Sequence, residues 1–202
     1  MLRIRSSPLF VTACVLGALL LGACSRSGTS PKSPQPAVAS AAARATPDLW
    51  HDLRTPLRLA RLAPGSSCPA TAAHAIAPWV GPAQGVGPAY PVGLSAPVSL
   101  RGAPAQDGRY AIKTLWVSDA VYTGPVLVRG LRLDAAGAVQ FALGSTPHVE
   151  LRLPLDGSAT TEGQDPGWRA WPAQTLVPGP GCYGLQIDGA GFSSIVVFSV
   201  AP

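Results

Sequence analysis

The chain has 202 residues, of which 47% are hydrophobic and 12% charged, and it contains 22 glycines and 22 prolines. This mixture is typical of many short strands joined by turns, and it disfavours long helices. Five of the 15 basic residues precede position 48, so the other ten balance the 10 acidic ones. The predicted folded part therefore carries no basic excess, which argues against a nucleic-acid partner.

Residues 1–23 are predicted to be an export signal. Two arginines are followed by an apolar run of about fifteen residues, shorter than the roughly 20 that a membrane-spanning helix requires. The run ends in Leu21-Gly22-Ala23-Cys24, which resembles the lipobox of bacterial lipoproteins. That resemblance implies cleavage before Cys24 and fatty-acid modification (palmitate) of its new N-terminus. An ordinary cleaved signal with a chance cysteine is the alternative.

The lipid would attach the protein to the membrane of the cell envelope. Ser25 follows the cysteine, where an aspartate would resemble the signal for inner-membrane retention. We therefore expect the outer membrane, facing the periplasm, if the cell is Gram-negative, and otherwise the outer face of the cytoplasmic membrane. Residues 24–47, rich in Ser, Pro and Ala, have almost no large apolar side chains and are predicted to be a disordered tether.

Residues 48–202 are predicted to form one domain, whose two cysteines are Cys68 and Cys182. Two thiols outside the cytoplasm, with neither a CxxC partner nor a nearby histidine, favour one disulfide over a metal pair or a nucleophile. We expect this bridge to join the early chain to the late chain.

Alternating apolar residues predict several half-buried strands, the clearest being His148–Leu153, in which Val149, Leu151 and Leu153 would share the inner face. Turn signals such as Asp107-Gly108 and Asp188-Gly189 lie beside these segments. The predicted strands are PLRLARL near 56, PVSLRG near 97, IKTLWV, PVLVRGLRL, AVQFAL, HVELRL, YGLQID and SSIVVFSV. Seven or eight strands indicate an all-β fold, a single antiparallel sandwich of immunoglobulin type, with a small barrel as the alternative.

Segment 69–96 is the least regular and is expected to wrap the domain as a long loop, a candidate surface for a ligand. Two further features are candidates for binding. Aromatics in the loop sequence DPGWRAWP could form a platform for sugars or peptides, although packing is the simpler interpretation. His148 and Glu150 would project from one strand face, where they could share a cation or simply be solvated. The candidate ligand surface comprises Trp79, Tyr90, His148, Glu150, Trp168 and Trp171.

The stretches KTLWVSDAVYTGPVLVRGLRLD, GWRAWP and PGPGCYGLQIDGAGFSSIVVFSV resemble a group of uncharacterised exported bacterial proteins with immunoglobulin-like sandwiches. The resemblance spans roughly residues 56 to 202. It implies the fold and no activity.

No catalytic residues, metal site or cofactor are predicted, because the chain has neither a Gly-x-Ser-x-Gly elbow nor a glycine-rich phosphate loop. The sequence therefore favours a non-enzymatic module that binds or scaffolds an envelope protein or glycan. The alternative is an envelope hydrolase acting on peptidoglycan, peptide or ester bonds through His74 or His148.

Overall fold

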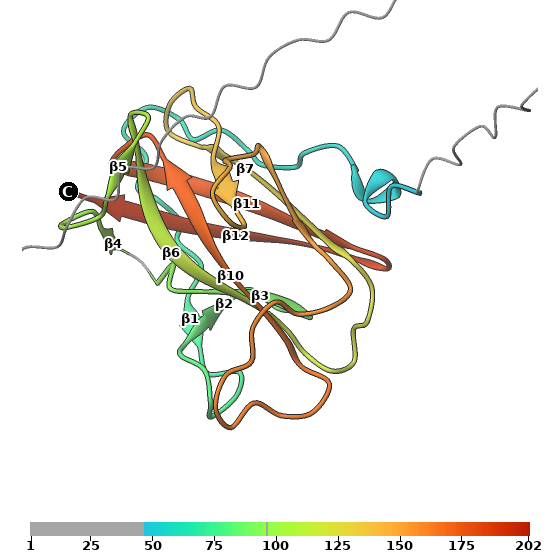
Figure 1. Cartoon of the computed structure of the whole chain (residues 1–202). Helices are drawn as coiled ribbons and strands as arrows, with labels where there is room; N and C mark the ends of the chain where they lie inside the picture. The colour runs from blue at the N-terminus through green and yellow to red at the C-terminus, as the bar shows by residue number, and fades with distance from the viewer. Residues whose placement is uncertain (1–46, 96) are drawn as a thin grey trace, which may run out of the picture. The chain divides into compact units, whose positions relative to one another are not determined.

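The computed structural model describes residues 47–95 and 97–202, which form two packed β-sheets (Figure 1). The predicted leader, Cys24 and all but the last residue of the predicted tether lie outside these residues. The first sheet has the order β1 (Ala73–His74), β2 (Ala83–Gln84), β3 (Ala89–Val92), β6 (Arg109–Ser118), β10 (Arg169–Val177) and β8 (Gln140–Ala142), and β5 (Ala105–Gln106) also pairs with β6. The second has the order β4 (Val98–Ser99), β12 (Phe192–Ala201), β11 (Gly181–Gly189), β7 (Val126–Arg132) and β9 (Glu150–Leu153). The predicted all-β sandwich is confirmed.

Apart from β9, which lies beside β7 but follows β8 in the chain, the longer strands have the order of an immunoglobulin domain. Strands β3-β6-β10-β8 correspond to the A-B-E-D sheet, and β7-β11-β12 to the C-F-G sheet. The phenol of Tyr183, near the start of β11, donates a hydrogen bond to the carbonyl of Gly179 at 2.6 Å, as the tyrosine corner of that fold does. The pairing is antiparallel except between β4 and β12, which run parallel.

The described chain contains twelve strands, four of them only two residues long, so the eight longer ones agree in number with the prediction. Their membership, however, differs. Two predicted strands are not among the longer ones, because residues 56–62 are irregular and PVSLRG near 97 forms only the two-residue β4. Two longer strands were not predicted: β3, and β10, which was expected to begin as a loop. Segment 69–96 is also not entirely a loop, because it contributes β1, β2 and β3 to the first sheet.

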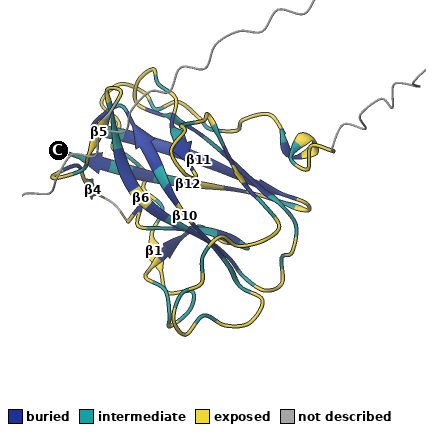
Figure 2. Cartoon of the chain, in the orientation of Figure 1, coloured by how far each residue is buried: buried dark blue, intermediate teal, exposed yellow. Residues whose placement is uncertain are grey.

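The core lies between the sheets and is built from the inward positions of each strand (Figure 2). On β12 every second residue, including Val196, Phe198 and Val200, is buried, which is the period expected of a strand with one face on a core. Trp116 and Trp171 sit opposite each other on β6 and β10 and are fully buried. Large aromatic side chains of this kind contribute most of the apolar area that stabilises a small sandwich.

Residues 54–72, which we call the strap, are tied to the second sheet through its outward polar side chains. Gln186 on β11 accepts a hydrogen bond from the Arg58 backbone N–H at 2.7 Å and donates to the Pro56 carbonyl at 3.2 Å. Asp188 is almost fully buried and binds Arg129 at 2.7 Å. The strap explains why both faces of β11 are buried.

Residues 56–62 of the strap, PLRLARL, were predicted as a strand, and this prediction is wrong. Side chains of β11 supply much of its hydrogen bonding, while the backbone of the 56–62 segment adds one bond to the sheet, from the Leu62 N–H to the Leu133 carbonyl. The predicted disulfide is confirmed: Cys68 in the strap is bonded to Cys182 in β11, with Cα atoms 5.5 Å apart.

Turn chemistry is confirmed in one hairpin and shifted in another. Asp107 and Gly108 both have positive φ and connect β5 to β6, as a two-residue hairpin of this sequence requires. Asp188 and Gly189, predicted as a turn, belong to β11, and the turn lies at residues 190–191. Within the described residues, no helix has the length and apolar character to span a bilayer.

Candidate functional site

The six predicted ligand residues lie at three surface places and in the core. Trp79 and Trp168 contact each other, His148 and Glu150 line one hollow, Tyr90 lies beside His74, and Trp171 is in the interior.

Trp171 is removed from the candidate surface by the structure. It belongs to β10 and its side chain is fully buried. Its indole N–H donates to the Asp156 carbonyl at 2.9 Å, and the Arg169 guanidinium lies 5.1 Å from its ring centroid. The expectation that Trp168 and Trp171 share one loop is therefore wrong, because the strand begins between them and turns Trp171 inward.

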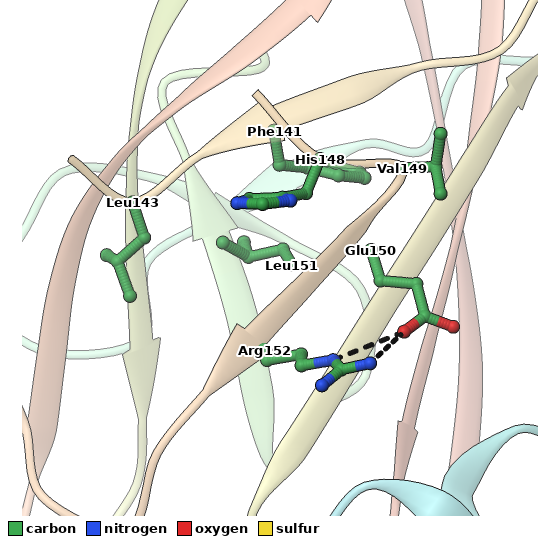
Figure 3. Close-up of a pocket in the computed structure, with 7 residues that line it drawn as sticks. All are labelled: Phe141, Leu143, His148, Val149, Glu150, Leu151 and Arg152. Carbon is green, nitrogen blue, oxygen red and sulfur yellow. Dashed lines mark hydrogen bonds and ion pairs between the residues drawn. The ribbon is translucent and has the colours of Figure 1, made fainter. Parts of the chain in front are cut away.

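The hollow that holds His148 and Glu150 lies beside β9, an edge strand, and has a volume of about 490 Å³ (Figure 3). Its other lining residues are Phe141, Leu143, Val149, Leu151 and Arg152. Val149 is 60% exposed there, so it does not share the inner face with Leu151 and Leu153 as predicted. Strand β9 begins one residue later, at Glu150.

Glu150 is held by arginines. Arg54 binds its two carboxylate oxygens at 2.9 and 3.1 Å, and Arg152 binds one of them at 3.0 Å. The hydrogen bonds from Arg54, more than those from Arg152, hold the pKa of Glu150 below its ordinary value against the opposing effect of burial. The carboxylate is thus already neutralised on the protein, which leaves it poorly suited to bind a cation.

His148 does not join Glu150 in a site. Its imidazole is directed toward Leu143 and away from the carboxylate (Figure 3). Among residues 47–95 and 97–202, no cluster of three metal-ligating side chains occurs. In the same ranges, no hydrogen bond links the imidazole of His148 or His74 to a serine or a carboxylate. The hollow therefore combines an apolar wall with a closed ion-pair network.

Trp79 and Trp168 are brought together from loops that are far apart in the sequence. Trp79 lies between β1 and β2, and Trp168 directly precedes β10. The ring centroids are 5.5 Å apart with the planes at 87°, an edge-to-face pair. Both side chains are partly exposed. The indole N–H of Trp79 donates to a carboxylate oxygen of Asp165 at 3.3 Å.

The loop that carries Trp168 is fixed by Gln164. Its side-chain oxygen accepts a hydrogen bond from the Thr161 N–H at 3.1 Å, and its side-chain nitrogen donates to the Trp168 carbonyl at 2.7 Å. Gly167 has a φ of +82°, and a Cβ there would come within 2.9 Å of the Ala120 Cβ. These contacts hold the Trp79–Trp168 pair in place, so we call the two indoles with Asp165 the aromatic loop site.

Tyr90 and His74 form a third, smaller contact. Their ring centroids are 6.3 Å apart, with His74 on β1 and Tyr90 on β3 of the first sheet. Burial, and secondarily the charge of Asp119, raise the pKa of the Tyr90 phenol above its ordinary value, so it is protonated at neutral pH.

The sequence analysis did not single out Asp165, Gln164 or Arg169. Asp165 is the first residue of DPGWRAWP and Gln164 directly precedes it, and the frequency of carboxamides and carboxylates in tight turns is the signal that could have marked them. Arg169 gives no such signal, because its role depends on carbonyl groups from distant loops.

Comparison with known proteins adds no relative: the chain matches no protein-family model, no curated protein and no solved structure. The fold and the site geometry alone define the protein as an immunoglobulin-like β-sandwich with an aromatic pair displayed on its loops.

Proposed function

We propose that the protein is a lipid-anchored component of the bacterial cell envelope whose sandwich is a non-enzymatic binding module. The lipobox-like sequence before Cys24 supports the anchor, and the Ser/Pro/Ala-rich segment behind it supports a spacer between membrane and domain. The proposal extends to no specific biological process.

The observation that carries the binding role is the aromatic loop site. Two partly exposed indoles from loops far apart in the sequence contact each other at the surface, and hydrogen bonds of Gln164 fix the loop that carries Trp168. Immunoglobulin-type sandwiches cluster loops at their two ends, and adaptable loops on a rigid scaffold are where such domains bind ligands.

The geometry around the histidines favours binding over hydrolysis. A nucleophile-and-base arrangement requires a serine within hydrogen-bond reach of an imidazole that a third group orients. The carboxylate nearest in sequence to His148 is Glu150, and its oxygens are occupied by two arginines.

The test is photo-crosslinking of the full chain in intact cells, with a photoreactive amino acid in place of Glu162, an exposed residue of the loop that carries Trp168. We expect one envelope component to be captured repeatedly. A photoreactive residue at Arg101, an exposed turn position between β4 and β5, is the matched control and is expected to give a different pattern. Capture of nothing above background, or identical products from both positions, would contradict the binding role.

Hydrolysis is tested separately with a panel of peptidoglycan, peptide and ester substrates. Turnover that is lost in His74→Ala or His148→Ala, with the thermal unfolding curve unchanged, would replace the binding module with the hydrolase.

A further inference from the structure

We infer that the aromatic loop site binds a neutral or N-acetylated sugar ring of a glycan, with the ring stacked on an exposed indole face and a hydroxyl donating to Asp165. This inference rests on the proposed binding function and specifies the chemical class of its ligand.

The shape of the aromatic pair suits a flat ligand ring. In an edge-to-face contact, the ring that presents its edge keeps both of its own faces clear of its partner. Trp79 and Trp168, at 87° and both partly exposed, meet at a right angle. A pyranose ring has an apolar C–H face that fits a flat aromatic surface, and the second indole would limit where that ring can slide.

Asp165 places a polar group at the edge of the aromatic pair. Asp165 uses one carboxylate oxygen to accept from Trp79 at 3.3 Å, and its side chain is exposed. An ionised carboxylate is an acceptor with about four lone-pair directions, so it can also accept from ligand hydroxyls. Sugars supply such hydroxyls around the rim of the same ring that stacks. Stacking and hydrogen bonding would therefore act on one ligand together.

The charges around the site favour a neutral ligand. Glu162 and Asp165 are exposed acidic residues of the same loop. The nearest cation in the sequence, Arg169, directs its terminal nitrogens at the carbonyls of Tyr122 and Leu155, each at 2.7 Å. Its positive charge is therefore engaged by the protein. A phosphorylated or otherwise anionic ligand would meet the carboxylates of Glu162 and Asp165, so a neutral sugar is favoured.

The backbone of this loop favours a glycan over an extended peptide. Strand addition needs unpaired backbone groups at the binding surface. Within this loop the N–H groups of Gln164 and Trp168 donate to the carbonyls of Thr161 and Asp165. The backbone next to the indoles is thus already bonded to itself, and recognition falls to side chains. A fixed loop also loses little conformational entropy when it binds.

The experiment uses residues 45–202, a compact unit that contains the whole core and the disulfide. Calorimetric titration with a trimer of N-acetylglucosamine and with a trimer of glucose tests the two neutral sugar types. A trilysine peptide tests whether cations bind instead. We expect saturable binding to at least one sugar and affinity reduced roughly tenfold by Trp79→Ala or Trp168→Ala, the loss expected for one aromatic contact.

Asp165→Asn is expected to weaken sugar binding roughly threefold, since an amide oxygen accepts less strongly than a carboxylate. Trp50→Phe is the matched control: Trp50 is also partly exposed, but its N–H donates to the Val126 carbonyl and its ring lies under Arg152. Sugar affinity should not change in this variant. Thermal unfolding of each variant separates loss of binding from loss of fold.

Failure of both sugars to bind, binding of trilysine alone, or sugar binding that survives loss of either indole in a folded variant would overturn the glycan assignment. A specific crosslinked partner obtained beside negative sugar titrations would leave the binding module standing and assign it a non-glycan ligand. The two proposals therefore fail in distinguishable ways.

Discussion

Arg169 is a partly buried cation whose neighbours are carbonyl groups rather than carboxylates. One terminal nitrogen donates to the carbonyls of Tyr122 and Gly124 at 2.7 and 3.1 Å, and the other to that of Leu155 at 2.7 Å. Burial lowers the pKa of the guanidinium, although it remains charged at any ordinary pH. The residue joins the loop after β6 to the loop after β9.

Replacing Arg169 with Met should lower the free energy of unfolding by about 3 kcal/mol, because several carbonyls lose a charged donor while the apolar stem is kept. Urea unfolding at neutral pH measures the loss. Arg169→Lys keeps the charge but has a single nitrogen, so it should recover only part of the stability. An unchanged unfolding midpoint in Arg169→Met would show that the loops are held by other contacts.

Glu150 predicts an acid-dependent loss of stability. Its pKa is lowered in the folded state, chiefly by Arg54, so its contribution is present above the ordinary pKa of about 4.5 and is lost as the pH falls through the lower folded value. Glu150→Gln should therefore lower the urea midpoint more at pH 7 than at pH 3. A difference from the wild type that is equal at both pH values would contradict this role for the ionised carboxylate.

At the scale of the elements, the strap depends on the disulfide. Cys68 and Cys182 are 114 residues apart, and closing a loop of that length contributes about 4 to 5 kcal/mol on the chain-entropy account. Paired Cys68→Ser and Cys182→Ser substitutions should lower the unfolding temperature under oxidising conditions and bring proteolysis into residues 54–67. Wild-type protein treated with reductant should behave like the variant. A further loss when the variant itself is reduced would point to a different cause.

The sequence predicted β9 from a hydrophobic period that reflects a core on one face, because that period is local information, and it predicted β12 from a long apolar run. It failed for the strap, where alternating leucines imitate a strand but much of the hydrogen bonding comes from side chains of β11, which lies far away in the chain. It also failed for β10, whose Pro172 suggests a break. The neighbouring strand β8 pairs only with residues 174–176 of β10. Pro172 therefore has no partner on that side, and its missing N–H breaks no hydrogen bond to β8.

The candidate site was predictable only in part. Trp79 and Trp168 were selected as exposed-loop aromatics, but their contact depends on how two loops approach each other, which no spacing in the sequence encodes. Trp171 was selected by the same reasoning and is buried, because it lies within β10 on the face that packs against the core. His148 and Glu150 line one hollow, but the imidazole points away from the carboxylate, and Arg54, which neutralises Glu150, comes from the distant strap.

At the scale of the whole molecule, the distribution of charge agrees with a domain held near a membrane. Cleavage before Cys24 would leave three basic residues, Arg26, Lys32 and Arg44, in the predicted tether, where anionic lipid would attract them, while residues 48–202 have no net formal charge. A single acyl chain gives only marginal membrane binding, so stable attachment requires the two or three chains that the lipobox resemblance implies.

Cys24→Ala is the variant that tests this arrangement. It removes the thiol that would accept the lipid, so we expect a precursor that keeps its leader, incorporates no labelled fatty acid and migrates more slowly than the mature wild type. Cys14→Ala removes a cysteine within the predicted leader and is the matched control, in which labelling and processing should be normal. Labelling that persists in Cys24→Ala would contradict Cys24 as the lipidated residue. Cleavage to the mature size without any lipid would leave the sandwich exported by an ordinary signal. It would then require a partner other than the bilayer to hold it at the envelope.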